Sequence, residues 1–156
     1  MDKNKIKELK DCLSQYLENN NLRHSKERDK IFDAVCSMPG HFDIDELQTK
    51  LEEQRFHVSR ATLYNVLELL IKANLLVTHN MSNFRTRYEL KCLADGHYHL
   101  ICTECGAIRE IETMVMKNEF EKFKISRFTP DYFALYVYGI CSKCKFKKRM
   151  QKSQKK

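Results

Sequence analysis

The sequence predicts an α+β protein with two domains, a helical N-terminal domain that ends in a β-hairpin and a smaller α/β C-terminal domain. Apolar residues recur at helical spacing up to about residue 74, and the pattern then changes to strand alternation. Two C-x-x-C pairs, Cys102/Cys105 and Cys141/Cys144, lie in the C-terminal part. We place the domains at residues 1–88 and 89–146, and a basic disordered tail at 147–156.

Four short helices are expected in the first domain. Their apolar residues form one stripe each, and serine residues suitable as N-caps precede the second and fourth helices. The expected bounds are 5–19, 25–38, 44–51 and 59–70. Four helices joined by short loops suit a helical DNA-binding module better than an enzyme core.

A β-hairpin follows the fourth helix. Two short strands, 75–77 and 84–90, flank the polar turn 80–83, so this hairpin would form the wing of a winged helix-turn-helix domain. Arg85 and Arg87 alternate on one face of the second strand, where they could lie along a phosphate backbone. A hinge is expected at 91–96, followed by strands at 97–101, 107–111 and 133–138 and a helix at 114–123.

The formal net charge of +7 comes entirely from the last twelve residues. Residues 145–156 carry seven cations and no acid, and the remaining 144 residues carry 21 charges of each sign. Any specific DNA surface in the body must therefore come from local segregation of charge, while the tail adds salt-sensitive, non-specific attraction. Neither a signal core nor a membrane-length apolar run is visible, which predicts a cytoplasmic protein with no membrane partner.

The two C-x-x-C pairs predict a structural zinc site, because four thiolates suit tetrahedral Zn(II) and leave no open position for catalysis. A redox pair and an iron-sulfur or rubredoxin-type iron site are the alternatives. Among the other cysteines, Cys12 and Cys36 are expected in the core. Cys92, near the hinge, is a candidate thiol switch or haem ligand.

His97 and His99 are two residues apart on a predicted strand, so both imidazoles leave the same face and could chelate a metal. Glu89, at the end of the wing, and Glu110, on the following strand, could supply carboxylates. His41 would join this set only if the two domains fold against each other. The alternative is a pair of solvated surface histidines.

The fourth helix is the candidate recognition helix, since the side opposite its apolar stripe carries polar groups that can reach base edges and phosphates. An ordinary solvated helix face is the alternative interpretation. The candidate DNA contacts, including cations that precede the recognition helix and cations on the wing, are Arg23, Lys26, Arg28, Ser59, Arg60, Thr62, Tyr64, Asn65, Arg85 and Arg87.

The whole pattern resembles the ferric-uptake-regulator (Fur) family. The residues that carry the resemblance are Leu22-Arg23, Ser25, Arg28, His41, Ser59-x-Ala61-Thr62-x-Tyr64, Tyr88-Glu89-Leu90, His97-x-His99-Leu-Ile-Cys102-x-x-Cys105-Gly106, Tyr138-Gly139 and Cys141-x-x-Cys144. The resemblance implies a homodimer with an N-terminal winged helix and a C-terminal dimerisation domain. It also implies a regulatory metal site of His41, Glu89, His97, His99 and Glu110, and structural zinc on the four cysteines.

The function expected from the resemblance is a metal-responsive transcriptional repressor that binds palindromic double-stranded operator DNA. Fe(II), Zn(II) or Mn(II) would occupy the regulatory site. Asn65 and the His97-Tyr98-His99 run look like the peroxide-sensing branch of the family, which gives a peroxide sensor as the alternative, whereas Glu89 favours the iron-responsive branch.

A zinc-ribbon interaction protein or metallochaperone is the alternative from another class. An enzyme is not expected, and neither is a small-molecule substrate. Zinc deaminases use H-x-E and P-C-x-x-C contexts, and neither context occurs in this chain.

Overall fold

The computed structural model describes residues 1–79, 86–94, 97–112, 126–129 and 134–153. The chain divides into two compact units, Met1–Leu93 and Ala94–Lys156, and each is described by itself. Within the described residues, no helix combines the length and the apolar character needed to cross a bilayer.

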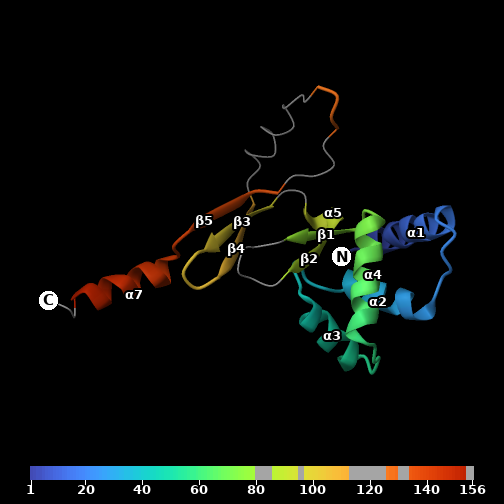
Figure 1. Cartoon of the computed structure of the whole chain (residues 1–156), viewed down its shortest axis with the longest axis horizontal. Coiled ribbons are helices and arrows are strands. Elements are labelled where there is room, and N and C mark those ends of the chain that lie inside the picture. Colours follow the sequence, from blue (N-terminus) through green and yellow to red (C-terminus); the bar gives the residue numbers. More distant parts are fainter. Residues whose placement is uncertain (80–85, 95–96, 113–125, 130–133, 154–156) are drawn as a thin grey trace. The chain divides into compact units, whose positions relative to one another are not determined.

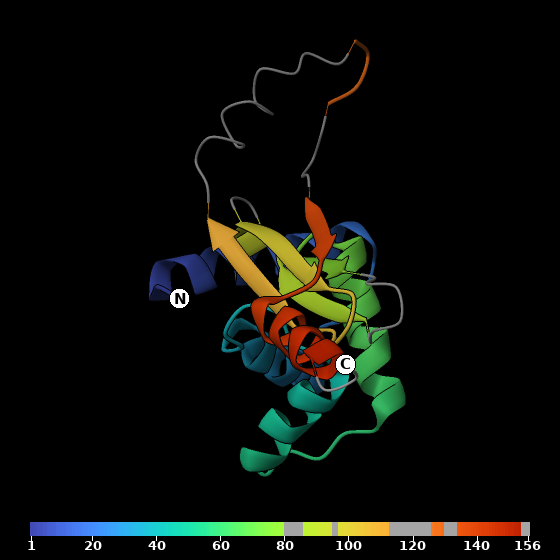
Figure 2. The same ribbon diagram turned by 90° about the vertical axis from the view of Figure 1, so that its left-hand side faces the viewer.

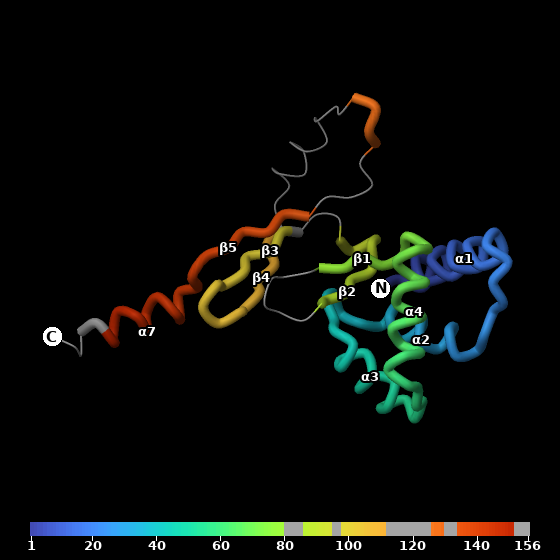
Figure 3. The backbone as a smooth tube through the Cα atoms, in the orientation of Figure 1, coloured from blue at the N-terminus to red at the C-terminus, as the bar shows by residue number. Residues whose placement is uncertain are grey.

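The first unit contains four helices of ten or more residues (Figure 1). Their bounds are α1 Lys3–Asn19, α2 Lys26–Cys36, α3 Ile44–Glu53 and α4 Arg60–Lys72. Side chains that satisfy first-turn amides set the starts of the last three: Ser25 and Ser59 accept from amides three residues on, and Asp43 forms a reciprocal capping box with Glu46. The tube in Figure 3 follows α4 directly into the first strand.

The core of the first unit forms where the apolar stripes of the four helices meet. Buried members include Leu17 of α1, Phe32 of α2, Leu47 of α3 and Leu67 of α4. Cys36 is buried as predicted. The prediction that Cys12 lies in the core is wrong, because the buried stripe of α1 is the narrow i, i+4, i+8 row of Leu9, Leu13 and Leu17, which leaves Cys12 exposed.

The hairpin after α4 consists of β1, Leu76–His79, and β2, Arg87–Leu90, paired antiparallel. A third segment joins it: Phe42 exchanges backbone hydrogen bonds with Tyr88 on the other side of β2. The predicted turn 80–83 and the start of the predicted strand 84–90 lie outside the described residues. A short helix, α5 Lys91–Ala94, lies in the stretch expected as a hinge.

The second unit contains a three-stranded sheet of β3 His97–Cys102, β4 Ile108–Glu112 and β5 Tyr136–Gly139. Its strand order is β4-β3-β5, with β4 antiparallel and β5 parallel to β3 (Figure 2). The predicted helix 114–123 lies outside the described residues, and β5 begins three residues later than the expected strand at 133.

The helix α7, Ser142–Ser153, follows β5. A disordered tail is expected from residue 147 onward, but residues 147–153 are helical. Lys, Arg, Met and Gln have good helix propensity, and the turn at Cys144 provides a start from which the helix can extend. The cations of this stretch therefore lie on a helix.

Candidate metal centres and nucleic-acid interface

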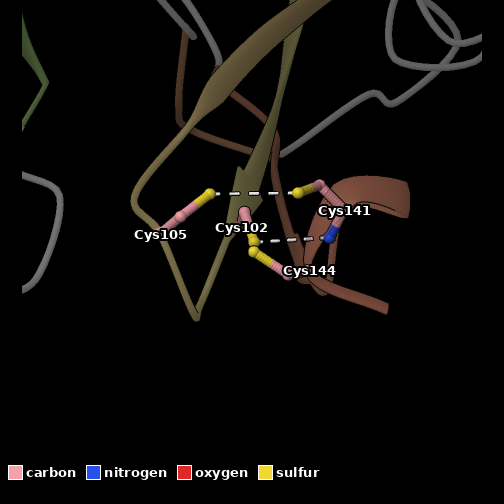
Figure 4. A group of neighbouring side chains, drawn as sticks. All are labelled: Cys102, Cys105, Cys141 and Cys144. Carbon is pink, nitrogen blue, oxygen red and sulfur yellow. Dashed lines mark hydrogen bonds between the residues drawn. The ribbon is translucent and has the colours of Figure 1, made fainter. Parts of the chain in front are cut away.

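The four cysteines of the C-x-x-C pairs meet in the second unit (Figure 4). Cys102 is the last residue of β3, and Cys141 follows the end of β5 by two residues. Because β3 and β5 are parallel neighbours with Cys102 opposite Gly139, both pairs lie at the same end of the sheet. The parallel pairing thus brings together two motifs that are separated by more than thirty residues in sequence.

The spacing of the sulfurs fits a tetrahedral metal. All four Sγ atoms lie within 4.8 Å of one another, and those of Cys105 and Cys141 are 3.8 Å apart. Zn–S bonds of about 2.3 Å require tetrahedral edges of about 3.8 Å. Gly106 has a φ of +72°, a left-handed conformation that glycine adopts readily, and its amide donates to the Cys102 carbonyl at 2.9 Å to close the first turn.

The electrostatics of the cysteine cluster favour a bound cation. The amide of Cys141 donates to the Sγ of Cys102 at 3.3 Å, and this bond, with a further one from the amide of Cys105, lowers the pKa of Cys102 to about 6. The neighbouring sulfurs of Cys105 and Cys141 raise the pKa of Cys144 to about 12. Four thiolates at this spacing therefore need a dication to be deprotonated together.

Two residues of the predicted regulatory set come together in the first unit. His41 Nε2 lies 3.2 Å from Glu89 Oε2, and both side chains are buried. The Phe42–Tyr88 bridge explains the contact, because in an antiparallel pairing His41 then stands opposite Glu89. Arg87 extends the group by donating from Nη2 to the His41 carbonyl at 3.2 Å.

A third side chain that could bind a metal, and that is not among the residues predicted from the sequence, lies in the same group. His79, the last residue of β1, places Nε2 3.3 Å from the same Oε2 of Glu89 and is 2% exposed. The alternation of side chains along the hairpin could have indicated His79. Val77 is paired with Glu89, so their side chains share a face, and His79, two residues after Val77, lies on that same face. A single histidine without an H-x-H pattern gave no such signal.

In the second unit, the paired strands β3 and β4 place His99 directly opposite Glu110. His99 is buried and stacks on Tyr136 of β5, with ring centroids 5.2 Å apart, whereas Glu110 is exposed. His97 occupies the register position opposite Glu112. The register thus keeps one histidine and one carboxylate of the predicted set side by side.

Two arginines among the predicted DNA contacts form ion pairs with α3. Arg60, at the start of α4, pairs with Asp45, and Arg87 pairs with Glu46 at 3.2 Å. The hydrogen bond to the Asp45 carboxylate is the main reason why the pKa of Arg60 is raised. Both acids lie in the first turn of α3, so they reduce the positive potential between α3, α4 and the wing.

The other predicted contacts divide into exposed and internally bonded groups. Tyr64 is 49% exposed on α4, and Asn65, Lys26 and Arg23 are also exposed. Arg28 is half-buried and donates from Nη1 to the Arg23 carbonyl at 2.5 Å. The hydroxyls of Ser59 and Thr62 are 2.9 Å apart at the start of α4, and Arg85 lies outside the described residues.

Cys92 has no features of a haem ligand. It is half-buried against the core of the first unit, and burial raises the pKa of its thiol. A haem-binding cysteine acts as a thiolate, so the haem expectation finds no support here.

The chain matches the model of the Ferric uptake regulator family over residues 19–138. It is 32% identical over 112 residues to the Ferric uptake regulation protein of Bacillus subtilis, covering 67% of this chain and 72% of that protein. It is also 26% identical over 139 residues to the Peroxide operon regulator of the same organism, covering 88% of this chain and 93% of that protein.

Solved structures share the architecture. The ferric uptake regulator Fur of Helicobacter pylori, described as having three functional metal binding sites, gives a TM-score of 0.67 at 21% identity and covers 90% of this chain and 93% of that one. The Vibrio cholerae regulator gives 0.60 at 27% identity, covering 81% and 98%. The predicted α+β fold of a winged helix followed by an α/β unit with a four-cysteine cluster is confirmed, and the chain belongs to the ferric uptake regulator family.

Proposed function

We propose that this protein is a metal-responsive transcriptional repressor that binds palindromic operator DNA as a homodimer. The convergence of His41 and Glu89, 3.2 Å apart and buried in the winged-helix unit, is the observation that carries the proposal. Buried charged groups are either paired with one another or coordinate metals, and imidazole and carboxylate are donor types that suit Fe(II), Zn(II) and Mn(II). Family membership supplies the DNA-binding role.

The regulatory metal would be held by His41 and Glu89 from the first unit, and by His97, His99 and Glu110 from the second. Imidazole and carboxylate donors suit Fe(II), Zn(II) and Mn(II), and the supply of each metal in the cell would help to choose among them. Since the ligands come from both units, a bound metal would select one relative orientation of the units. In a dimer, that orientation would set the spacing of the two α4 helices on the operator.

The cysteine cluster would hold Zn(II) in a structural role. Its four sulfurs supply a complete tetrahedral set, with no position left for a water or a substrate. The zinc would fix the end of the β3–β5 pair to the start of α7, which the ion pair between Lys148 Nζ and Glu104, at 2.6 Å, also joins.

Exposed apolar groups on the second unit support dimerisation. Val137 and Tyr138 of β5 are 46% and 50% exposed, and Phe146 of α7 is 64% exposed. In the described part of the sheet β5 is an edge strand, with backbone groups available for another strand. A second copy of this chain would cover these groups, as the family's dimeric organisation implies.

Elemental analysis of the purified protein, followed by a metal-titrated mobility-shift assay on its own promoter DNA, tests the proposal. We expect about one zinc ion per chain on the cysteines and DNA binding that depends on a second metal. The double variant His97→Ala/His99→Ala should lose this dependence while it keeps the cysteine-bound zinc. Unchanged metal dependence in the variant would contradict the proposal. A protein that binds zinc but no promoter DNA would be a zinc-ribbon or metal-carrier protein instead.

Peroxide sensing is a second candidate, favoured by the 26% identity to the Peroxide operon regulator of B. subtilis over 88% of this chain. Iron at the regulatory site would make its histidines targets for oxidation. Mass spectrometry of the iron-loaded protein after peroxide treatment should then show one added oxygen on His41 or His97, together with loss of DNA binding. If the histidines stay unmodified, peroxide sensing is excluded and the metal-responsive function remains.

A further inference from the structure

Three buried ligand-type side chains converge on one point of the winged-helix unit. The Nε2 atoms of His41 and His79 lie 3.2 and 3.3 Å from the same atom, Oε2 of Glu89. The two imidazole rings are 4.7 Å apart between centroids and inclined at 61°. Because the rings meet edge to face, each can direct a ring nitrogen toward the shared carboxylate oxygen.

The backbone pairing of this unit accounts for the convergence. Along β2, Tyr88 pairs with Thr78 on one side and with Phe42 on the other, and these three side chains share a face. The neighbouring positions, His41 and Glu89, therefore occupy the opposite face. His79 lies on that face too, because it is two residues after Val77, which is paired with Glu89. Three separate chain segments thus contribute one donor each.

The spacing and chemistry of the three donors suit a transition metal. Metal bonds of about 2.0–2.1 Å to nitrogen and oxygen require donor separations of about 2.9 Å along an octahedral edge and about 3.4 Å along a tetrahedral edge. The observed 3.2 and 3.3 Å lie between these values. Two imidazoles and one carboxylate also form a donor set that binds zinc and iron in many proteins.

We propose that His79 is a direct ligand of the regulatory metal, so that the winged-helix unit supplies three donors. This inference rests on the proposed metal-responsive function and adds a ligand to the set that family resemblance implies. It has a consequence for signalling. A metal held by His79 joins the end of β1 to β2 and to the segment before α3, so metal binding would fix the base of the wing directly.

Cobalt titration of the full-length protein, with zinc retained on the cysteines, tests the ligand. The comparison uses the wild type, His79→Gln, and His57→Gln as a matched control, since His57 is exposed on the loop before α4. We expect His79→Gln to weaken Co(II) binding at the second site at least ~10-fold. In the NMR spectrum of the cobalt protein, His79→Gln should also lose one hyperfine-shifted exchangeable imidazole proton. His57→Gln should change neither quantity.

A second variant separates a ligand from a hydrogen-bonding neighbour of Glu89. His79→Cys should keep Co(II) binding and add a near-ultraviolet thiolate-to-cobalt absorption band, which the zinc-filled cysteine cluster does not produce. Circular dichroism and zinc content would show that each variant is folded.

Three outcomes separate this inference from the proposed function. An unchanged number of shifted imidazole protons in His79→Gln, or no charge-transfer band in a folded His79→Cys, would overturn the role of His79 alone. In those cases the wild type would still bind Co(II), and His41→Gln would still abolish binding. A wild-type protein that takes up no second metal would refute the proposed function as well.

Discussion

Phe42 and Tyr88 exchange two backbone hydrogen bonds, at 2.9 and 2.7 Å, and so attach the segment before α3 to the second strand of the wing. Their rings lie 5.9 Å apart between centroids on the core side of the hairpin. The opposite side of the same pairing carries His41 and Glu89. Packing of the core and assembly of the candidate metal ligands therefore depend on one short contact.

Replacing Phe42 with Ala should affect both properties. Phe42 is 1% exposed, so the cavity should lower the free energy of unfolding by about 3–5 kcal/mol. Loosening of the bridge should also weaken metal binding at the His41 and Glu89 pair. Denaturant unfolding followed by circular dichroism, together with cobalt titration, gives the two readouts. Phe56→Ala, at a half-exposed position, is the control and should lower the stability less. If both variants lost the same stability and the same cobalt affinity, the Phe42–Tyr88 bridge would not be what couples the core to the metal ligands.

Ser59 combines two predicted roles, as the N-cap of α4 and as a DNA contact. Ser59→Ala removes the hydrogen bond that the Ser59 hydroxyl accepts from the Thr62 amide and should lower the free energy of unfolding by about 1 kcal/mol. Ser59→Asp keeps a capping oxygen and should leave stability close to wild type, yet its charge should repel phosphate and weaken operator binding. Thermal unfolding and DNA titration separate the two effects, and wild-type DNA affinity in Ser59→Asp would exclude a phosphate near Ser59.

The acids of α3 should oppose DNA binding. Asp45→Asn removes the ion-pair partner of Arg60 and should raise DNA affinity by roughly 2–5-fold, because a negative charge next to an exposed arginine is lost. Glu53→Gln, at the far end of α3, makes the same charge change and serves as the control. Fluorescence anisotropy at two salt concentrations measures both variants. An affinity that falls in Asp45→Asn would mean that the pair instead positions Arg60 for DNA.

The zinc site should depend on each of the four cysteines. Cys102→Ser should lower zinc from about one ion per chain to near zero and destabilise the second unit, whereas the exposed Cys12→Ser should change neither.

Acidification should have the same effect as the substitution. Protons compete with zinc for the four thiolates, so zinc should be released as the pH falls. Metal analysis after dialysis checks both expectations, and full zinc retention in Cys102→Ser would exclude this site.

The basic C-terminal segment should supply non-specific attraction to DNA. Lys145→Gln combined with Lys147→Gln should flatten the dependence of log K on log salt by up to about 1.8, while the preference for operator over random DNA is kept. Lys148 is left in place because it pairs with Glu104. The same double change at Lys3 and Lys7, on α1, is the control for net charge. A loss of operator preference in the Lys145 and Lys147 variant would assign these lysines to specific recognition.

Local patterns in the sequence were sufficient to predict the four helices of the first unit, the hairpin and the two cysteine pairs. Ser25 and Ser59 cap their helices, and the apolar stripes they introduce are buried, because capping and helical periodicity act over only a few residues. Spacing alone also indicated which cysteines act together, since C-x-x-C is a local turn. Cys12 shows the limit of this reasoning, because the width of a buried stripe depends on what packs against it.

Contacts between distant segments were decided only by the tertiary structure. The Phe42–Tyr88 bridge sets His41 against Glu89, the hairpin register adds His79, and the parallel β3–β5 pairing brings the cysteine pairs together. The ion pairs of Arg60 and Arg87 with acids of α3 could not be predicted from the sequence either. Periodicity records which side of an element faces inward, but not which other element it meets. Backbone pairing across tens of residues is fixed by packing of the whole unit, and the candidate sites lie where such pairings occur.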